Sequence, residues 1–169
     1  MEVPIWYADW EYRCCGRDIS IGDQVEWTLF WDCRELFTAS QEAPSIRVSD
    51  LELDAVLEWV PQEKAAGGVA MMARWGELQL GIIAPRDSVL SAGMVHGRGK
   101  VWYQHHVDPI PHSVGTLQAI YRHPMVFRRI NERQGVFDHY EEGASISSTA
   151  DTKNSSGDFR FLVEIGVSP

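Results

Sequence analysis

The sequence lacks the features that place a chain in a membrane or outside the cell. It contains no run of about 18 consecutive apolar residues, so it predicts no membrane-spanning helix. Its first residues, MEVPIWYADW, have neither the basic start nor the apolar core of a secretory signal. The 3 cysteines are an odd number and two are adjacent, which does not suit a disulfide framework. We therefore expect a protein of the reducing cytoplasm.

Common catalytic signatures are missing as well. The patterns G-x-S-x-G, H-E-x-x-H and C-x-x-C do not occur. The stretch 93–100, GMVHGRGK, is similar to a phosphate-binding loop, but Met94 stands where the first glycine is needed. Val101 also replaces the Ser or Thr that would bind Mg²⁺. We therefore predict that 93–100 is a flexible loop, and Pro85 with three glycines makes 84–99 loop-like as well. No reaction class follows from these residues.

Negative charge is in excess and is unevenly distributed. The 169 residues carry a formal net charge of −9. Residues 1–60 hold 13 acidic and 4 basic side chains, whereas residues 61–169 hold 11 of each. An acidic surface keeps a protein in solution, disfavours the phosphate backbone of nucleic acids and favours basic partners.

The most strongly patterned stretch runs from Cys14 to Trp31, CCGRDISIGDQVEWTLFW. Gly16 and the pair Gly22-Asp23 are typical of turns. Apolar residues then alternate with polar ones, and four of them share one face of a predicted strand: Val25, Trp27, Leu29 and Trp31. Large aromatic side chains dominate cores, so the 7 tryptophans of this chain predict a buried apolar layer.

Two more elements are predicted on either side of this stretch. Residues 3–14 alternate and predict a strand that pairs antiparallel with it, through the turn at Gly16. The apolar face of that strand would contain Trp6, Ala8, Trp10, Tyr12 and Cys14. Residues 49–60 predict the one helix, because Ser49 and Glu52 have capping-box spacing. The apolar residues Leu53, Val56, Leu57 and Val60 follow helical spacing.

The remainder of the chain alternates short extended segments with loops. Residues 69–75 and 78–83 predict a hairpin that turns at Gly76. Further strands are predicted over 101–107, 115–121, 125–130 and 159–167. Residues 131–157 are polar and predict a mobile loop, so deleting 144–157 would leave stability nearly unchanged.

Many short alternating segments with one helix predict a mainly β fold. The simplest architecture is a small twisted antiparallel barrel, SH3-like or OB-like, because closure removes exposed strand edges. We expect a single domain over 1–169, with an insertion at about 40–100 and the mobile loop at about 131–157. This fold class carries no activity by itself.

Three blocks of the sequence resemble a known family. The first is W-x-x-x-CCG-x-x-I-x-I-GD-x-V-x-WTL over 10–29, and it is the most specific. The others are the paired histidines with the following G-T-L-x-x-I, within 101–122, and the closing FLVEI over 161–165. Together they resemble an uncharacterised family of bacterial proteins, mainly from actinomycetes. The resemblance implies a cytoplasmic bacterial domain and no assigned activity.

Cysteines and histidines are the residues with reactive chemistry. Thiolate and imidazole suit zinc, so Cys14, Cys15 and His105 are candidate metal ligands. Adjacent cysteines on a strand point to opposite faces, however, so the alternative is that Cys14 is buried and Cys15 faces outward. A histidine at 105 or 106 next to a carboxylate could act as a general base.

These observations favour a non-catalytic binding or interaction module over a small enzyme or a zinc domain. The candidate binding residues are Trp10, Arg13, His105 and His106. The partner would be a protein or a small molecule, with no cofactor unless zinc is bound. Arginines 122, 128, 129 and 133 lie near aromatic residues, as in some nucleic-acid sites, but the net charge of −9 argues against that partner. A pocket with a histidine bonded to a carboxylate would favour the enzyme.

The alternation predicts that Trp27 is buried, so removing its side chain should be costly. Trp27→Ala is expected to lower the free energy of unfolding by about 3–5 kcal/mol, because it removes a large apolar contact and leaves a cavity. Urea unfolding measures this difference. A loss below about 1 kcal/mol would show that the strand is misplaced.

Overall fold

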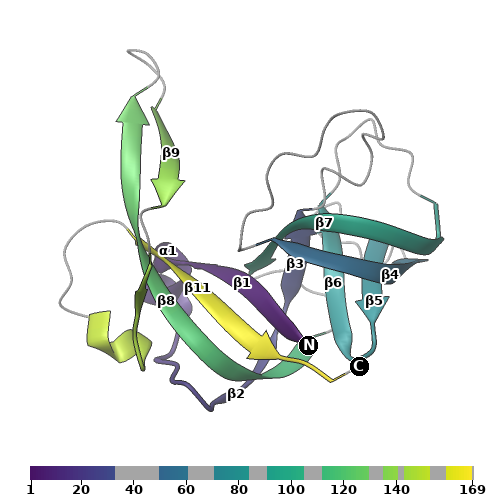
Figure 1. Ribbon diagram of the computed structural model, residues 1–169, viewed down its shortest axis with the longest axis horizontal. Helices are drawn as coiled ribbons and strands as arrows, with labels where there is room; N and C mark the ends of the chain where they lie inside the picture. The colour runs from purple at the N-terminus through teal and green to yellow at the C-terminus, as the bar shows by residue number, and fades with distance from the viewer. Residues whose placement is uncertain are drawn as a thin grey trace.

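The computed structural model describes residues 1–32, 50–60, 71–83, 91–104, 112–129, 135–140, 143–152 and 159–168. The protein is mainly β, with a closed five-stranded barrel and one short α-helix, as the sequence predicts. Figure 1 shows two parts, a barrel and a second sheet that grows out of it. Neither described helix is long and apolar enough to cross a membrane.

The barrel closes through five strands that each pair with the next. Their order is β3 (Leu29–Asp32), β6 (Leu78–Ile83), β5 (Met71–Trp75), β4 (Leu51–Trp59) and β7 (Gly93–Tyr103). The last strand, β7, pairs again with β3 and so completes the ring. All these pairs are antiparallel except β3 with β6, which is parallel. Alternate side chains of every strand therefore point into a common interior.

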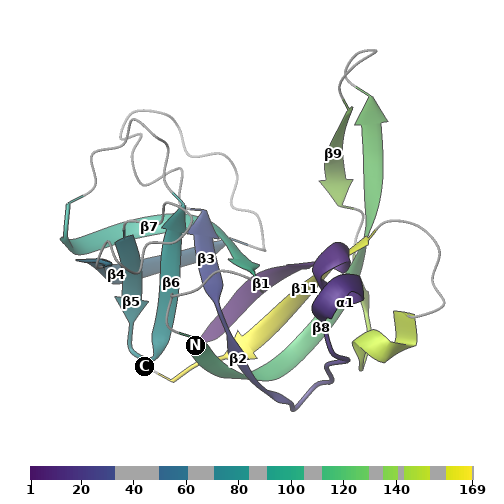
Figure 2. The same ribbon diagram turned by 180° about the vertical axis from the view of Figure 1, so that it is seen from behind.

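The second sheet starts from the barrel strand β7. That strand pairs in parallel with β1 (Glu2–Ala8), which pairs with β11 (Phe159–Gly166), which pairs with β8 (Ser113–Arg129). Three short strands also pair with β8: β2 (Gln24–Trp27), β9 (Gly135–Tyr140) and β10 (Ala144–Ser145). Figure 2 shows the helix α1 (Asp9–Cys15) against one face of this sheet, with the 3₁₀ helix η3 (Thr149–Thr152) beside it.

The predicted helix over 49–60 is wrong, because this stretch forms β4. The residues Leu51, Leu53, Ala55 and Leu57 alternate strictly and are buried. The same stretch also contains a helical spacing, so periodicity alone supports both structures. Pairing decides between them, since β4 lies between β5 and β7 and gains partners on both edges. The described residues of 40–100 supply β4, β5, β6 and most of β7, and the expected insertion stays a prediction.

The N-terminal prediction is also wrong in part. The strand ends at Ala8, and α1 occupies the rest of the predicted strand. The strand β1 pairs with β11 and β7 rather than with the stretch after Gly16. Because the alternation stops at Ala8, Tyr12 is buried while Trp10 is 61% exposed and Cys14 is exposed. The amide of Gly16 donates to the carbonyls of Glu11 and Tyr12 and ends the helix.

Two predicted loops contain regular structure. Residues 93–99, expected in a flexible loop, form the first part of β7 and pair with β4. Residues 131–157, expected to lack structure, include β9, β10 and η3 among the described residues. The long strand β8 also continues through Pro124, where the sequence predicted an interruption.

Other predictions are confirmed. The hairpin of β5 and β6 turns at Gly76, whose φ of 56° is the left-handed conformation that glycine adopts readily. Trp27 is 8% exposed, and its neighbours on the same face are buried. The last strand is buried along its predicted apolar face, at Phe159, Phe161, Val163 and Ile165. The single domain over 1–169 stays a prediction.

The segment 143–152 is docked onto the turn that follows α1. The amide of Ile21 donates to the carbonyl of Ser147, at 3.1 Å. Ile19 and Thr149 bond in both directions: Ile19 N donates to Thr149 Oγ1 at 3.0 Å, and Thr149 N donates to the Ile19 carbonyl at 3.0 Å. These bonds correct the expectation that deletion of 144–157 would be neutral, since the segment satisfies buried polar groups.

The Thr149 hydroxyl should therefore matter for stability. Thr149→Val keeps the shape but leaves the amide of Ile19 without its acceptor, so we expect a loss of about 1–3 kcal/mol in urea unfolding. Thr116→Val is a matched control, because Thr116 Oγ1 accepts only an exposed bond from Gln24 in the described structure. The control should change stability by less than about 0.5 kcal/mol. Equal effects of the two substitutions would contradict the docking of this segment.

Candidate functional site

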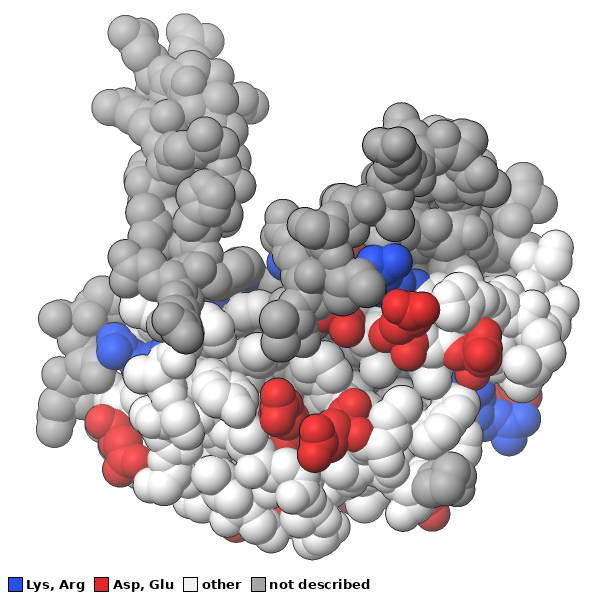
Figure 3. All heavy atoms as spheres, in the orientation of Figure 1, with Lys and Arg blue, Asp and Glu red and all other residues white. Residues whose placement is uncertain are grey.

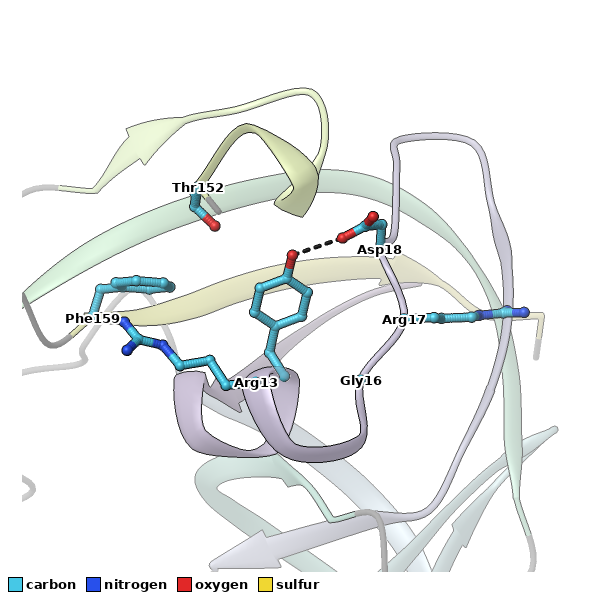
Figure 4. Close-up of a pocket in the computed structure, with 7 residues that line it drawn as sticks. Arg13, Gly16, Arg17, Asp18, Thr152 and Phe159 are labelled. Carbon is cyan, nitrogen blue, oxygen red and sulfur yellow. Dashed lines mark hydrogen bonds between the residues drawn. The ribbon is translucent and has the colours of Figure 1, made fainter. Parts of the chain in front are cut away.

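A cavity of about 600 Å³ opens between α1, η3 and the start of β11. We call it the α1 cavity (Figure 4). Its lining consists of Tyr12, Arg13, Gly16, Arg17, Asp18, Thr152 and Phe159. Three separate parts of the chain therefore build it: α1 with the turn that follows, the end of η3, and β11. The pairing of β1 with β11 brings these distant parts together.

The floor of the α1 cavity is aromatic and buried. Phe159 is 1% exposed and Tyr12 is 7% exposed. Both rings pack on Phe161, with centroid distances of 5.2 Å from Phe159 and 5.5 Å from Tyr12. The edge-to-face geometry of these contacts is the arrangement that aromatic pairs prefer, so the floor is well packed.

A hydrogen-bond network fixes the polar side of the cavity. The Tyr12 hydroxyl lies 2.7 Å from Asp18 Oδ1 and 3.2 Å from the carbonyl oxygen of Thr149. A hydroxyl carries one proton, so we assign the donation to the nearer, charged acceptor, Asp18. The Thr149 carbonyl accepts from Thr152 Oγ1 at 2.7 Å. The network joins α1, the turn and η3, and it holds the Asp18 carboxylate at the rim (Figure 4).

Arginines supply the positive side. The Arg13 guanidinium carbon lies 5.3 Å from the centre of the Phe159 ring, and that of Arg122 on β8 lies 4.7 Å from it. Figure 4 shows Arg13 reaching toward Phe159, whereas Arg17 extends away from Tyr12. Arg122 Nε is buried and has no hydrogen-bond partner among the described residues. Two guanidinium groups thus lie close to the aromatic floor.

A second cavity, of about 540 Å³, lies on the other side of Gly16 and Arg17. We call it the β2 cavity, because all four residues of β2 line it. Its wall contains three mutually packed rings, with centroids 4.8 Å apart for Tyr7–Tyr103, 5.0 Å for Trp27–Tyr103 and 5.8 Å for Tyr7–Trp27. The rings contact one another at interplanar angles of 51° to 74°, so they form a packed aromatic cluster.

Two histidines are bonded to carboxylates. His112 Nδ1 lies 3.2 Å from Glu26 Oε1, and His112 lines a third cavity of about 520 Å³ beside β5 and β6. His96 lies 2.9 Å from Asp54 and 3.3 Å from Glu52 on the outside of the barrel. All these side chains are largely exposed. The hydroxyl of Ser113, next to His112, is instead engaged with the backbone of Gln79.

Acidic side chains gather on the opposite face from α1. Figure 3 shows more Asp and Glu than Lys and Arg on this face, over the second sheet and over the barrel. Burial raises the pKa of Glu164 on β11, and the nearby carboxylate of Glu2 raises it further. These groups lie outside the lining of the α1 cavity, whose described lining has two arginines and one aspartate.

Of the site residues predicted from the sequence, the structure places one, Arg13, at the α1 cavity. Arg13 belongs to the lining of that cavity. Trp10 is exposed on α1 and lines none of the three cavities described above. His105 and His106 lie outside the described residues. Cys14 is exposed, which corrects its expected burial, because α1 replaces the strand there. The side chain of Cys15 is not described, and no group of three metal-binding side chains occurs among the described residues.

Asp18, Thr152 and Phe159 were not expected in a site. Phe159 was predicted only as a core residue of the last strand. One signal for η3 was present, since Ser148 and Asp151 have the spacing of a capping box. The amide of Ser148 indeed lies 3.3 Å from Asp151 Oδ2. Nothing in the sequence indicates that this turn packs beside Tyr12.

Comparison with known proteins gives one match. A family model matches residues 1–165, and its description is a family of unknown function (DUF6578). No curated protein and no solved structure matches the chain.

The wall between the two cavities depends on Gly16. A Cβ atom on Gly16 would lie 2.6 Å from the Cα of Tyr12 and even closer to the Tyr7 hydroxyl, so it cannot fit without moving backbone. Gly16→Ala should therefore lower the free energy of unfolding by about 1–3 kcal/mol. Gly166→Ala is the control, because its Cβ would meet only the flexible side chain of Gln118, at 3.1 Å. Chemical denaturation of both variants checks this, and an unchanged Gly16→Ala protein would contradict the packing described.

Proposed function

We propose that this chain, which belongs to the family of unknown function DUF6578, is a non-catalytic binding module whose ligand occupies the α1 cavity. Its volume of about 600 Å³ is typical of small-molecule sites, which are concave and mostly apolar with a few placed polar groups. The aromatic floor matches the apolar part of such a site and the charged rim its placed polar groups, although this lining is more polar than is typical.

The observation that carries the proposal is the network around the Tyr12 hydroxyl. It fixes Asp18 and the end of η3 before any ligand arrives. A preformed site avoids the entropic cost of ordering its side chains on binding, which raises affinity. Arg13 is also held over Phe159. Both charged groups at the rim thus have defined positions.

The chemistry of the lining favours binding over catalysis. The one aliphatic hydroxyl among its described side chains is that of Thr152, and it donates to the Thr149 carbonyl. A catalytic hydroxyl needs an adjacent general base that accepts its proton. The Asp18 carboxylate accepts from Tyr12 instead.

An enzyme remains the second candidate, on one specific observation. His112 lines a cavity and is bonded to Glu26, which is the pairing that a histidine base uses. The residue types near it give no reaction class. The histidines at 105 and 106 stay candidates from the sequence, and so do the zinc ligands Cys14, Cys15 and His105. Elemental analysis of the purified protein tests the zinc alternative, since about one equivalent of zinc would support it.

The sequence left a protein or a small molecule open as the partner, and for the α1 cavity we propose the small molecule. A basic protein partner for the acidic surface, and a cytoplasmic location, stay predictions. Neither prediction affects the test of the α1 cavity.

A fragment screen by two-dimensional ¹H–¹⁵N NMR tests the proposed site. We expect the amide signals of Gly16, Asp18 and Phe159 to shift with at least some fragments, because these residues line the cavity. Arg13→Trp fills the mouth of the cavity and should abolish these shifts. Arg74→Trp is the matched control, since Arg74 pairs with Glu58 on the barrel surface and should not affect binding. Thermal melts confirm that both variants are folded.

The result has two clear readings. Shifts at the α1 cavity that disappear in Arg13→Trp and persist in Arg74→Trp would support the proposal. Shifts confined to the β2 cavity or the barrel surface, or no shifts with any fragment, would contradict it.

A further inference from the structure

We propose that the ligand of the α1 cavity is an organic anion that carries a flat apolar group. The inference rests on the proposed function, since it assigns a ligand class to the same cavity. The flat group would pack against Tyr12 and Phe159, and its carboxylate or phosphate oxygens would bind the guanidinium group of Arg13.

The local charge of the cavity is the opposite of that of the surrounding chain. Residues 1–60 contain 13 acidic and only 4 basic side chains, yet two of those four, Arg13 and Arg17, line this cavity. One acidic side chain, Asp18, stands among the lining residues. Arg122 adds a third guanidinium group next to Phe159. A small positive region within an acidic molecule selects anions and directs them to one place.

The arginines are also positioned for this task. Both Arg13 and Arg122 lie over the Phe159 ring, so their long side chains have less conformational freedom to lose when an anion binds. The Nε–H of Arg122 is buried without a hydrogen-bond acceptor among the described residues. Because this atom is buried and Arg122 is absent from the described lining, Arg122 adds positive charge next to the Phe159 ring rather than a direct contact to the ligand. Guanidinium groups bind carboxylate and phosphate in two-pronged geometry.

The aromatic floor is the reason for assigning an apolar group to the ligand. Tyr12 and Phe159 are buried and almost inaccessible except where they face the cavity. Both rings meet Phe161 edge to face, at interplanar angles of 87° for Tyr12 and 70° for Phe159, so the floor is a rigid apolar surface. Aromatic groups gain most from such a surface, since they lose little conformational entropy and bury much area.

A cationic ligand fits the site less well. It would find one carboxylate, Asp18, which already accepts a hydrogen bond from the Tyr12 hydroxyl, and it would approach the guanidinium group of Arg13. Like charges within a few ångströms repel each other strongly in a partly buried site. The arrangement therefore favours an anion.

Four probes of nearly the same size separate the contributions of charge and apolar surface. They are benzoate, phenyl phosphate, benzyl alcohol and benzylammonium, each titrated at low salt and followed through the amide signals of Gly16, Asp18 and Phe159. We expect benzoate or phenyl phosphate to bind about 5–10-fold more tightly than benzyl alcohol, the gain of one charge-assisted contact. Benzylammonium should bind most weakly. Added salt should weaken the binding of the two anions and should not weaken the binding of the other two probes.

Substitutions then assign the contact. Arg13→Gln should weaken anion binding about 5–10-fold and leave benzyl alcohol unchanged, because it removes charge but keeps much of the side-chain length. Arg17→Gln should have a smaller effect, since that side chain points away from Tyr12 (Figure 4). Arg74→Gln, on the barrel surface, is the control and should have none.

The outcomes distinguish this inference from the proposed function. If benzyl alcohol binds at the cavity as tightly as benzoate and phenyl phosphate, or benzylammonium binds best, the anion class is wrong while the binding site stands. If Arg13→Gln weakens all probes equally, the assigned contact is wrong. If no probe and no fragment shifts these signals, the site itself is wrong. A preference for phenyl phosphate over benzoate, or the reverse, supports the class and identifies which oxyanion it is.

Discussion

The structure depends on the sharing of one long strand, β7, between two sheets. Its first part, 93–99, pairs with β4, and its last part, 100–103, pairs with β3, so one strand closes the barrel. At Val101 and Trp102, the edge of β7 that faces away from β3 pairs with β1 and starts the second sheet. Every element of the second sheet is therefore placed relative to the barrel by backbone hydrogen bonds. Val101 is fully buried at this junction, where both parts of the core meet.

The α1 cavity is a consequence of how that second sheet is completed. The chain leaves β1 at Ala8 and forms α1 directly, so Tyr12 stands over Phe161 of the neighbouring strand β11. The segment ending in η3 then closes the opposite side through the bonds between Thr149 and Ile19. The cavity thus forms where short irregular segments lie on a regular sheet, which is a common location for functional sites in proteins.

The sequence predicts those parts of the fold in which one periodicity stands alone. The hairpin at Gly76, the buried face around Trp27 and the last strand were all identified in this way, and so was the barrel class. It misassigned β4, because Leu53, Val56 and Leu57 fit a helix while Leu51, Leu53 and Ala55 fit a strand, and only pairing partners separate the two. It missed α1, because seven residues are too few for a helical period. Arg13 was identified, but its neighbours Thr152 and Phe159 are about 140 residues distant, and only tertiary pairing reveals them.

The pairing of β1 with β11 has a consequence for the order in which the protein acquires its parts during synthesis. The first strand emerges early, yet its antiparallel partner begins only at Phe159. All five barrel strands lie between residues 29 and 103, so the barrel can close while most of the second sheet is still untranslated. On the nascent chain α1 has neither Phe159 nor Phe161 to cover, and its aromatic face stays exposed. The cavity comes into existence only with the last strand, because Phe159 forms its floor.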